Sequence, residues 1–379
     1  MGNKLRSGFT TGTAAAAAAK GAIRIILEGR RPSQVQIRLL TGAHISIAIH
    51  SCRLRKNSQA ICSVIKDAGD DPDVTHKAEI GALVTLVSSN KLPATHATGQ
   101  RANIRILGGE GVGRVTKPGL EVAPGQPAIN PGPQKMIRQA IEDVLQEHHL
   151  FATVDAEIFV PRGKKLAEKT LNARLGILDG ISILGTTGIV RPMSHDAFIA
   201  TIESALSVAR ASGLEQVILT TGRRSERFAQ SYWHRMDSEA FIQIGDFFRL
   251  SLESAAKRGF SDIILAVFFG KALKMAQGVP HTHAAKSSLT LDKLSEWTLE
   301  ISKNSTLSQQ IANANTARHA FFILRDHQPQ VIVQVGNRIV AAAKRFAGQQ
   351  TRIQSIIFSY DGEVVFDSEN QRPPTELGI

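Results

Sequence analysis

The sequence predicts a multidomain α/β protein, with an α+β domain over residues 1–165 and a Rossmann-like α/β domain over residues 166–379. In the first half, short Val/Ile-rich segments follow one another without long helices between them, which is typical of a mainly antiparallel sheet. In the second half, strand-like runs that end in glycine turns alternate with helix-length segments. Such alternation is typical of a parallel sheet covered by helices.

The first half is expected to open with a helix, because residues 14–19 are all alanine, the best helix former. Lys20 and Arg24 follow this run, so it does not resemble the apolar core of a signal peptide. Five strands, a glycine- and proline-rich passage, a helix and one more strand come next. The strands are expected at 35–40, 45–50, 60–66, 81–88, 101–107 and 153–160, the passage at 108–133 and the helix at 134–148.

The second half is expected to contain five strands, at 181–185, 217–220, 241–244, 262–268 and 352–359. Helices are expected at 196–212, from about residue 224, after residues 246 and 271, and between 292 and 347. In such sheets, ligands bind beyond the carboxyl ends of the strands, where glycine turns let the backbone approach them. The glycine turns at 185–188, 222 and 245 are therefore candidate ligand sites, with ordinary turn chemistry as the alternative for each.

The charge of the chain favours an anionic partner. Lys and Arg number 45 against 33 Asp and Glu, which leaves a formal charge of +12. A nucleic acid would fit this charge, but the basic residues are scattered and no nucleic-acid-binding motif is present. A small polyanion, such as a macrocycle with acetate and propionate arms, fits as well. We therefore expect a small-molecule substrate and no nucleic acid, with the oligomeric state left open.

No export signal is visible in the sequence. No membrane segment is visible either, because no stretch approaches the roughly 20 apolar residues that cross a bilayer. We expect a cytoplasmic protein in which Cys52 and Cys62 are packed thiols, although a disulfide between them is geometrically feasible. No metal site is expected. The two cysteines lack a CxxC spacing, and His281 and His283 have no third ligand nearby.

Two glycine-containing segments do not match known phosphate-binding motifs. Residues 108–113 contain four glycines but do not follow the GxGxxG spacing. Gly270-Lys271 is not a P-loop, because Leu265 stands at the first glycine position and Ala272 at the Ser/Thr position. These mismatches disfavour a phosphoryl-transfer enzyme.

An acidic segment at residues 66–76 holds four carboxylates and one histidine. Its spacing is not that of a calcium-binding EF-hand loop, and a solvated turn is the alternative to a functional role. So many like charges nevertheless need basic neighbours, a cation or a function. We take Asp70, Asp73 and His76 as the catalytic candidates, because histidine is the side-chain type most suited to proton transfer near neutral pH and carboxylates can also transfer protons.

Several long motifs together resemble one family, the cobalt-precorrin-5B C(1)-methyltransferases, called CbiD. The motifs occur in order at residues 8–16, 66–76, 109–113, 116–120, 127–131, 170–177, 180–190 and 192–194. The resemblance spans most of the chain. A departure occurs at residues 267–271, where the family usually has Gly-His-Ile-Gly-Lys and this chain has Val-Phe-Phe-Gly-Lys.

The resemblance implies a methyltransferase of anaerobic cobalamin biosynthesis. The enzyme would move a methyl group from S-adenosylmethionine to carbon 1 of cobalt-precorrin-5B and yield cobalt-precorrin-6A. A non-catalytic corrinoid-intermediate binding protein is the alternative. The cofactor-binding candidates are Gly185, Thr186, Thr187, Gly188, Thr221, Gly222, Glu226 and Asp246. The substrate-binding candidates are Thr11, Gly12, Lys66, Arg114, Lys117 and Arg191.

Overall fold

The computed structural model describes residues 5–91, 102–283 and 290–370, which confirm a mixed α/β fold. The chain divides into two compact units, Met1–His195 and Asp196–Ile379. The sequence placed the domain boundary after residue 165, whereas the division between the compact units lies after residue 195. The reason is that the segment before this boundary pairs with the first unit. Ile181 bridges Val112, and Val190 pairs with Gly8.

The first unit is built on a five-stranded sheet with the order β4-β5-β6-β9-β7. These strands are β4 (Ser51–Lys56), β5 (Gln59–Ile65), β6 (Glu79–Lys91), β9 (Leu150–Phe159) and β7 (Asn103–Gly108). The pairs β4/β5, β5/β6 and β6/β9 are antiparallel, whereas β7 runs parallel to β9. Strand β4 was not predicted, because only Cys52 among its residues is buried and the apolar alternation is missing.

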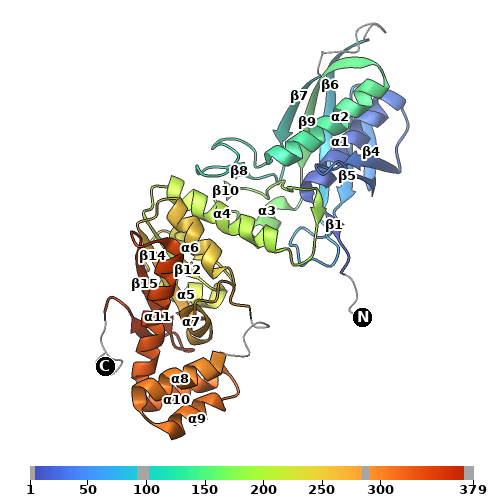
Figure 1. Cartoon of the computed structure of the whole chain (residues 1–379). Helices are drawn as coiled ribbons and strands as arrows, with labels where there is room; N and C mark the ends of the chain where they lie inside the picture. The colour runs from blue at the N-terminus through green and yellow to red at the C-terminus, as the bar shows by residue number, and fades with distance from the viewer. Residues whose placement is uncertain (1–4, 92–101, 284–289, 371–379) are drawn as a thin grey trace. The chain divides into compact units, whose positions relative to one another are not determined.

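Two long helices, α1 (Thr11–Glu28) and α2 (Pro131–Glu147), pack against each other and against this sheet (Figure 1). The six consecutive alanines of α1, residues 14–19, are fully buried. Their small side chains allow a close approach to both neighbours and do not reduce helix propensity. Thr10 caps the start of α1 through its hydroxyl, and Gly29 ends the helix with a φ of 71°.

Short ladders complete the first unit. The hairpin of β2 (Gln34–Arg38) and β3 (His44–Ala48) lies where two strands were predicted. Two-residue strands form two further antiparallel pairs, β1 (Gly8–Phe9) with β11 (Ile189–Val190) and β8 (Arg114–Val115) with β10 (Ile177–Leu178). A short helix, α3 (Gly163–Ala167), follows β9. The strand expected at 181–185 is not part of a parallel sheet, because Ile181 and Ile183 form only isolated bridges within the first unit.

The second unit contains a five-stranded sheet with the order β13-β12-β14-β15-β16. Its strands are β12 (Gln216–Thr220), β13 (Phe241–Gln243), β14 (Asp262–Phe268), β15 (Arg352–Phe358) and β16 (Val364–Asp367). All neighbours are parallel except β15 and β16. Strand β14 is apolar throughout its interior because it is buried on both faces. Ile263 and Leu265 belong to one core, and Ile264 and Ala266 to another.

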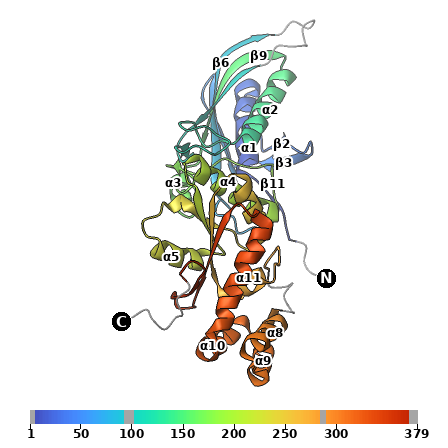
Figure 2. The ribbon, with the colours of Figure 1, turned by 60° about the vertical axis from the view of Figure 1, so that its left-hand side comes forward.

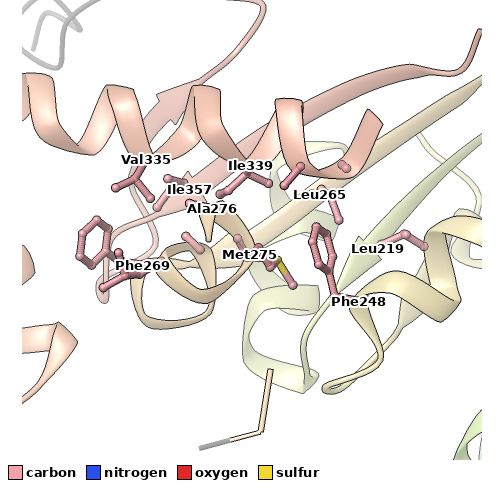
Figure 3. Close-up of a cluster of buried hydrophobic side chains, with 14 of the residues drawn as sticks. Leu219, Phe248, Leu265, Phe269, Met275, Ala276, Val335, Ile339 and Ile357 are labelled. Atoms are coloured by element: carbon pink, nitrogen blue, oxygen red, sulfur yellow. The ribbon is translucent and has the colours of Figure 1, made fainter. Parts of the chain in front are cut away.

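The helices of this unit supply the two cores. They are α4 (His195–Ala211), α5 (Arg223–Tyr232), α6 (Phe248–Lys257), α7 (Phe269–Ala276), α8 (Thr290–Ser302), α9 (Ser305–Ala312), α10 (Ala317–His327) and α11 (Pro329–Ala347), with a 3-10 turn at Ser238–Ala240. Figure 3 shows Val335 and Ile339 of α11 near Phe269, Leu265 and Ile357 in the larger core. Helix α5 covers the other face of the sheet. Helices α8, α9 and α10 lie together as a group (Figure 2).

The cysteines differ from expectation. Cys52 of β4 lies directly opposite Cys62 of β5 in the strand register, and the structure pairs them as a disulfide rather than as two thiols. Among the described residues, no helix is long and apolar enough to cross a membrane. The same residues contain no group of three or more His, Cys, Asp or Glu side chains that could hold a metal ion.

Candidate functional site

The acidic segment is organised around an ion pair between the buried Lys66 and the partly buried Asp73. The side chain of Lys66 is only 1% exposed, and its ammonium lies 2.5 Å from Oδ2 of Asp73. The other carboxylate oxygen of Asp73 accepts hydrogen bonds from the backbone N–H and hydroxyl of Thr75. Burial raises the pKa of Asp73, but Lys66 and Thr75 outweigh this effect and hold the pKa below its ordinary value. Asp73 is therefore an ionised structural partner of Lys66.

The same segment holds the beginning of the chain in place. The carboxylate of Asp67 pairs with the guanidinium of Arg6, and the hydrogen bonds from Arg6 and from the Gly69 backbone lower the pKa of Asp67 to about 2. The backbone N–H of Arg6 donates to Oδ2 of Asp70 at 2.6 Å. Asp71 accepts a hydrogen bond of 2.9 Å from the backbone N–H of Met193. The basic and backbone neighbours that so many carboxylates require are thus present.

His76 differs from the two acidic candidates in its hydrogen bonding and its exposure to solvent. Its Nδ1 accepts a hydrogen bond of 3.1 Å from the backbone N–H of Ala68, which places the proton of the neutral ring on Nε2. The side chain of His76 is 33% exposed. Asp70 and Asp73 already accept hydrogen bonds from Arg6 and Lys66. Of the three catalytic candidates, His76 therefore has the geometry best suited to proton transfer.

The threonine-rich start of α1 meets the glycine segment at 185–188. The hydroxyl of Thr11 donates to the carbonyl of Leu184 at 3.1 Å, and the N–H of Gly12 donates to the same carbonyl. The carbonyl of Gly188 accepts from the N–H of Thr10 and the hydroxyl of Thr13. These carbonyls satisfy donors that a helix start leaves unpaired. The predicted residues Thr11, Gly12 and Gly188 thus meet in a buried structural junction.

The predicted cofactor-binding residues do not all lie in the same unit. Gly185 and Gly188 lie in the first unit, and a Cβ at Gly185 would overlap the side chain of Thr10. Thr186 and Thr187 of the same loop are exposed. The remaining cofactor candidates, Thr221, Gly222, Glu226 and Asp246, lie in the second unit. The glycine segment at 185–188 was grouped with them because its strand was expected to belong to the parallel sheet.

The predicted substrate cations differ in their surroundings. Lys66 is buried and ion-paired, so its ammonium cannot hold a substrate carboxylate without breaking that pair. Arg114 and Arg191 are exposed, and Arg114 donates to the carbonyl of Gly125 at 2.7 Å. Lys117 is half-buried, and its aliphatic stem packs against Gly176. The two arginines are thus the most exposed cations of this set.

The second unit brings three cofactor candidates to one edge of its sheet. Strands β12 and β14 are neighbours, but the chain leaves them for opposite sides of the sheet, toward β13 and β15. Such a reversal opens a ligand-binding crevice at the carboxyl ends of the strands. Thr221 and Gly222 follow β12 at this edge, and a Cβ at Gly222 would meet only open space. Glu226, in the first turn of α5, is 5% exposed, and its carboxylate accepts a 2.6 Å hydrogen bond from Gln243.

Asp246, the fourth candidate, belongs to a polar cluster near the same edge. Its carboxylate pairs with the ammonium of Lys271 and accepts a 3.0 Å hydrogen bond from the hydroxyl of Thr282. Partial burial raises the pKa of Asp246, but Lys271 and Thr282 outweigh this effect and keep the pKa below its ordinary value. Burial and the nearby Lys271 lower the pKa of Lys274, whose ammonium donates a hydrogen bond to the backbone carbonyl of Thr282. Lys271 and Thr282 were not predicted as site residues, although Gly270-Lys271 had been considered and set aside as a P-loop.

These features define a two-unit α/β protein whose second unit carries a mainly parallel sheet with an open glycine turn and a buried glutamate at its carboxyl edge. Comparison with known proteins then identifies the family. A family model described as CbiD matches residues 1–192, and one described as CbiD, C-terminal domain, matches residues 281–369. This chain belongs to the CbiD family.

Full-length relatives agree with this assignment. A protein named cobalt-precorrin-5B C(1)-methyltransferase from Leptospira interrogans is 38% identical over 379 residues, and the match covers 100% of both chains. Proteins of the same name from Desulfotalea psychrophila and Geobacter metallireducens are each 40% identical, covering 95% and 96% of this chain and 97% and 98% of their own. A crystal structure of the cobalamin biosynthesis protein cbiD from Archaeoglobus fulgidus is 26% identical, covers 72% of this chain and 79% of its own, and has a TM-score of 0.37.

Proposed function

We propose that this chain is a cobalt-precorrin-5B C(1)-methyltransferase of cobalamin biosynthesis. The observation that carries the proposal is the 38–40% identity, over 95% or more of the chain, to relatives that bear this name. The methyl donor is S-adenosylmethionine, and the product is cobalt-precorrin-6A. The exposed Arg114 and Arg191 remain predicted ligands for the carboxylate arms of the substrate.

The donor is proposed to bind at the carboxyl edge of the second unit, which we interpret as Rossmann-like. Two features support this placement. The turn at Thr221 and Gly222 leaves open space for a ligand, and the buried carboxylate of Glu226 can accept hydrogen bonds from ribose hydroxyls. Asp246 is less suited to contact the donor directly, because its carboxylate is already neutralised by Lys271. Its role would be to hold the turn after β13 against the start of α7.

The chemistry is a displacement at the methyl carbon. The electron-rich ring carbon forms a bond to the methyl group, while the electron pair of the breaking C–S bond goes to sulfur and the sulfonium charge disappears. Alignment of the two reactants removes much of the entropic barrier. A site that excludes water favours the reaction further, because the positive charge of the donor is consumed as the bond forms. If a proton must leave the ring during the reaction, His76 is the proposed acceptor among the three catalytic candidates.

The direct test incubates the purified chain with cobalt-precorrin-5B and S-adenosylmethionine that carries a ¹³C-labelled methyl group. Mass spectrometry and NMR should show one labelled methyl group on carbon 1. Tight binding of the macrocycle without transfer would instead identify a corrinoid-intermediate binding protein. The donor site is tested separately by calorimetry. Glu226→Gln is expected to weaken S-adenosylmethionine binding, and unchanged affinity in both Glu226→Gln and Gly222→Ala would contradict the placement.

A further inference from the structure

Two arginines and two aromatic rings form a patch at the carboxyl edge of β14 and β15, which we call the Arg224–Arg318 patch. Phe268 is the last residue of β14, and Tyr360 lies two residues beyond the end of β15. Their rings stack with centroids 5.7 Å apart and an interplanar angle of 4°. The guanidinium carbon of Arg224 lies 5.3 Å from the centroid of Phe268, and that of Arg318 lies 4.7 Å from the centroid of Tyr360.

The positions of both guanidinium groups are constrained although both side chains are exposed. Each lies over a ring, an arrangement that stabilises a cation by attraction to the π face. Arg224 also donates a hydrogen bond to the carbonyl of Tyr360. Such contacts reduce the conformational entropy that an arginine loses when it binds an anion. The patch is therefore preorganised for a ligand with negative charge.

The charge of the patch is not neutralised internally. Within residues 5–91, 102–283 and 290–370, neither Arg224 nor Arg318 has a carboxylate within ion-pair distance. Burial raises the pKa of Tyr360, while the Gly270 backbone, Arg318 and Arg224 act in the opposite direction. The phenol thus keeps its proton at neutral pH and adds no negative charge. Two positive charges at the edge where parallel sheets bind ligands remain available to an external anion.

We infer that the Arg224–Arg318 patch binds carboxylate arms of the macrocyclic substrate, with one guanidinium group for each of two arms. This inference rests on the proposed function, because it takes the substrate to be a polycarboxylate. An arginine can present two parallel N–H donors to one carboxylate, and this fork geometry suits acetate and propionate groups. The half-buried faces of Phe268 and Tyr360 beside the arginines offer apolar surface to the ring of the macrocycle.

The test measures macrocycle binding and donor binding separately in full-length variants. Arg224→Gln and Arg318→Gln should each weaken cobalt-precorrin-5B binding about tenfold, the effect of losing one charge-assisted contact, and should raise KM more than they change kcat. Their affinity for S-adenosylmethionine alone should stay within about twofold of the wild type. Arg318→Lys keeps the charge but loses the fork, so its affinity should lie between those of the wild type and Arg318→Gln.

Matched controls remove the same charge from the same helices. Arg227→Gln removes an exposed arginine from α5. Arg325→Gln removes one from α10 that also lies over a ring, 5.1 Å from the centroid of Phe322, but is paired with Asp326. Both controls should bind the macrocycle as the wild type does. Equal affinity in the patch variants and the controls would overturn the inference, as would lost donor binding with intact macrocycle binding. If the wild type transfers the methyl group and the patch variants bind the macrocycle with wild-type affinity, only the role assigned to the Arg224–Arg318 patch is overturned. If the wild type does not bind the macrocycle, both that role and the proposed function are overturned.

Discussion

At the scale of single residues, the acidic segment shows how surroundings decide what a side chain does. Lys66 was a substrate-binding candidate and Asp73 a catalytic one, yet they form a buried ion pair with each other. Removing a charge from water costs free energy, and in this pair the attraction between the two opposite charges offsets that cost. Each charged side chain therefore depends on the presence of the other. The Lys66–Asp73 pair is therefore expected to contribute mainly to the stability of the fold rather than to the reaction.

Removal of one partner should expose this dependence. Asp73→Asn leaves the ammonium of Lys66 buried without its counter-ion, and we expect the free energy of unfolding to fall by about 3 kcal/mol. Chemical denaturation measures this value. Arg105→Gln is the control, because Arg105 pairs with Asp155 at the surface and its side chain is 60% exposed. That variant should lose less than about 1 kcal/mol. An equal loss in the two variants would contradict the role assigned to the buried pair.

The Arg6–Asp67 pair leads to a prediction about pH. The pKa of Asp67 is lowered to about 2, so the stabilisation from this pair is present above the ordinary carboxyl pKa of 3.8 and is lost as the pH falls through about 2. Arg6→Gln should raise the pKa of Asp67 toward 3.8, although the Gly69 N–H still lowers it in part. NMR titration of the carboxyl carbon measures the shift. Arg55→Gln, at an exposed arginine of β4, should leave this pKa unchanged. A pKa that stays at about 2 in Arg6→Gln would refute the assigned cause.

A substitution at Gly222 can test whether the donor binds against this turn, because it is not expected to change the stability of the protein. A Cβ at this position meets no atom of the protein, and a φ of 167° is extended backbone that any residue adopts. Gly222→Ala should therefore leave the melting temperature unchanged. If the donor binds against this turn, the added methyl group should raise the Kd for S-adenosylmethionine by about tenfold or more. Calorimetry gives the Kd and a thermal melt supplies the control. Unchanged affinity would move the donor away from the turn.

At the scale of elements, the helices of the second unit are positioned by the strands that they cover. Helix α11 carries a glycine in its middle, although glycine weakens helices by about 1 kcal/mol relative to alanine. The packing explains this choice. Gly336 lies under the ring of Phe366 in β16, and a Cβ at Gly336 would overlap that ring.

The contact between α11 and β16 can be tested with a double-mutant cycle. Gly336→Ala should gain helix propensity but lose more through overpacking, for a net loss of about 2 kcal/mol in the free energy of unfolding. The same substitution should cost less in a Phe366→Leu background, because the smaller side chain leaves room for the methyl group. Denaturation of all four proteins gives the coupling. An identical cost in both backgrounds would show that the ring is not the cause.

At the scale of the whole molecule, the chain forms two compact units with separate hydrophobic cores. The core of the first unit contains the alanines of α1 and the inward face of its sheet. The cores of the second unit lie on the two faces of its parallel sheet. Proteins with separate cores commonly depart from two-state unfolding.

Local substitutions should therefore act on one unit at a time. Asp73→Asn is expected to lower protection from hydrogen exchange in β5 and β6, and Gly336→Ala in β14 and β15, with little change in the other unit. Hydrogen exchange followed by mass spectrometry resolves the two regions. A loss of protection spread evenly over both units in either variant would show that they unfold as one.

The sequence alone determined most of the helices and strands, because periodicity and turn residues act over short windows. Residues 14–19 predicted α1, and the apolar run at 262–268 predicted β14. The family was also recognisable from sequence, because long motifs in register do not depend on knowledge of the fold. Strand β4 was missed because only one of its residues is buried.

The tertiary structure decided which side chains act together. Lys66 with Asp73, Arg6 with Asp67 and Lys271 with Asp246 became known partners only in the folded chain. The same holds for the carbonyls of Leu184 and Gly188, which satisfy the start of α1 from more than 170 residues away. The physical reason is that burial and charge pairing depend on distances that the whole fold sets. A sequence pattern identifies a carboxylate or a glycine, but only its neighbours determine whether it holds the structure or meets a ligand.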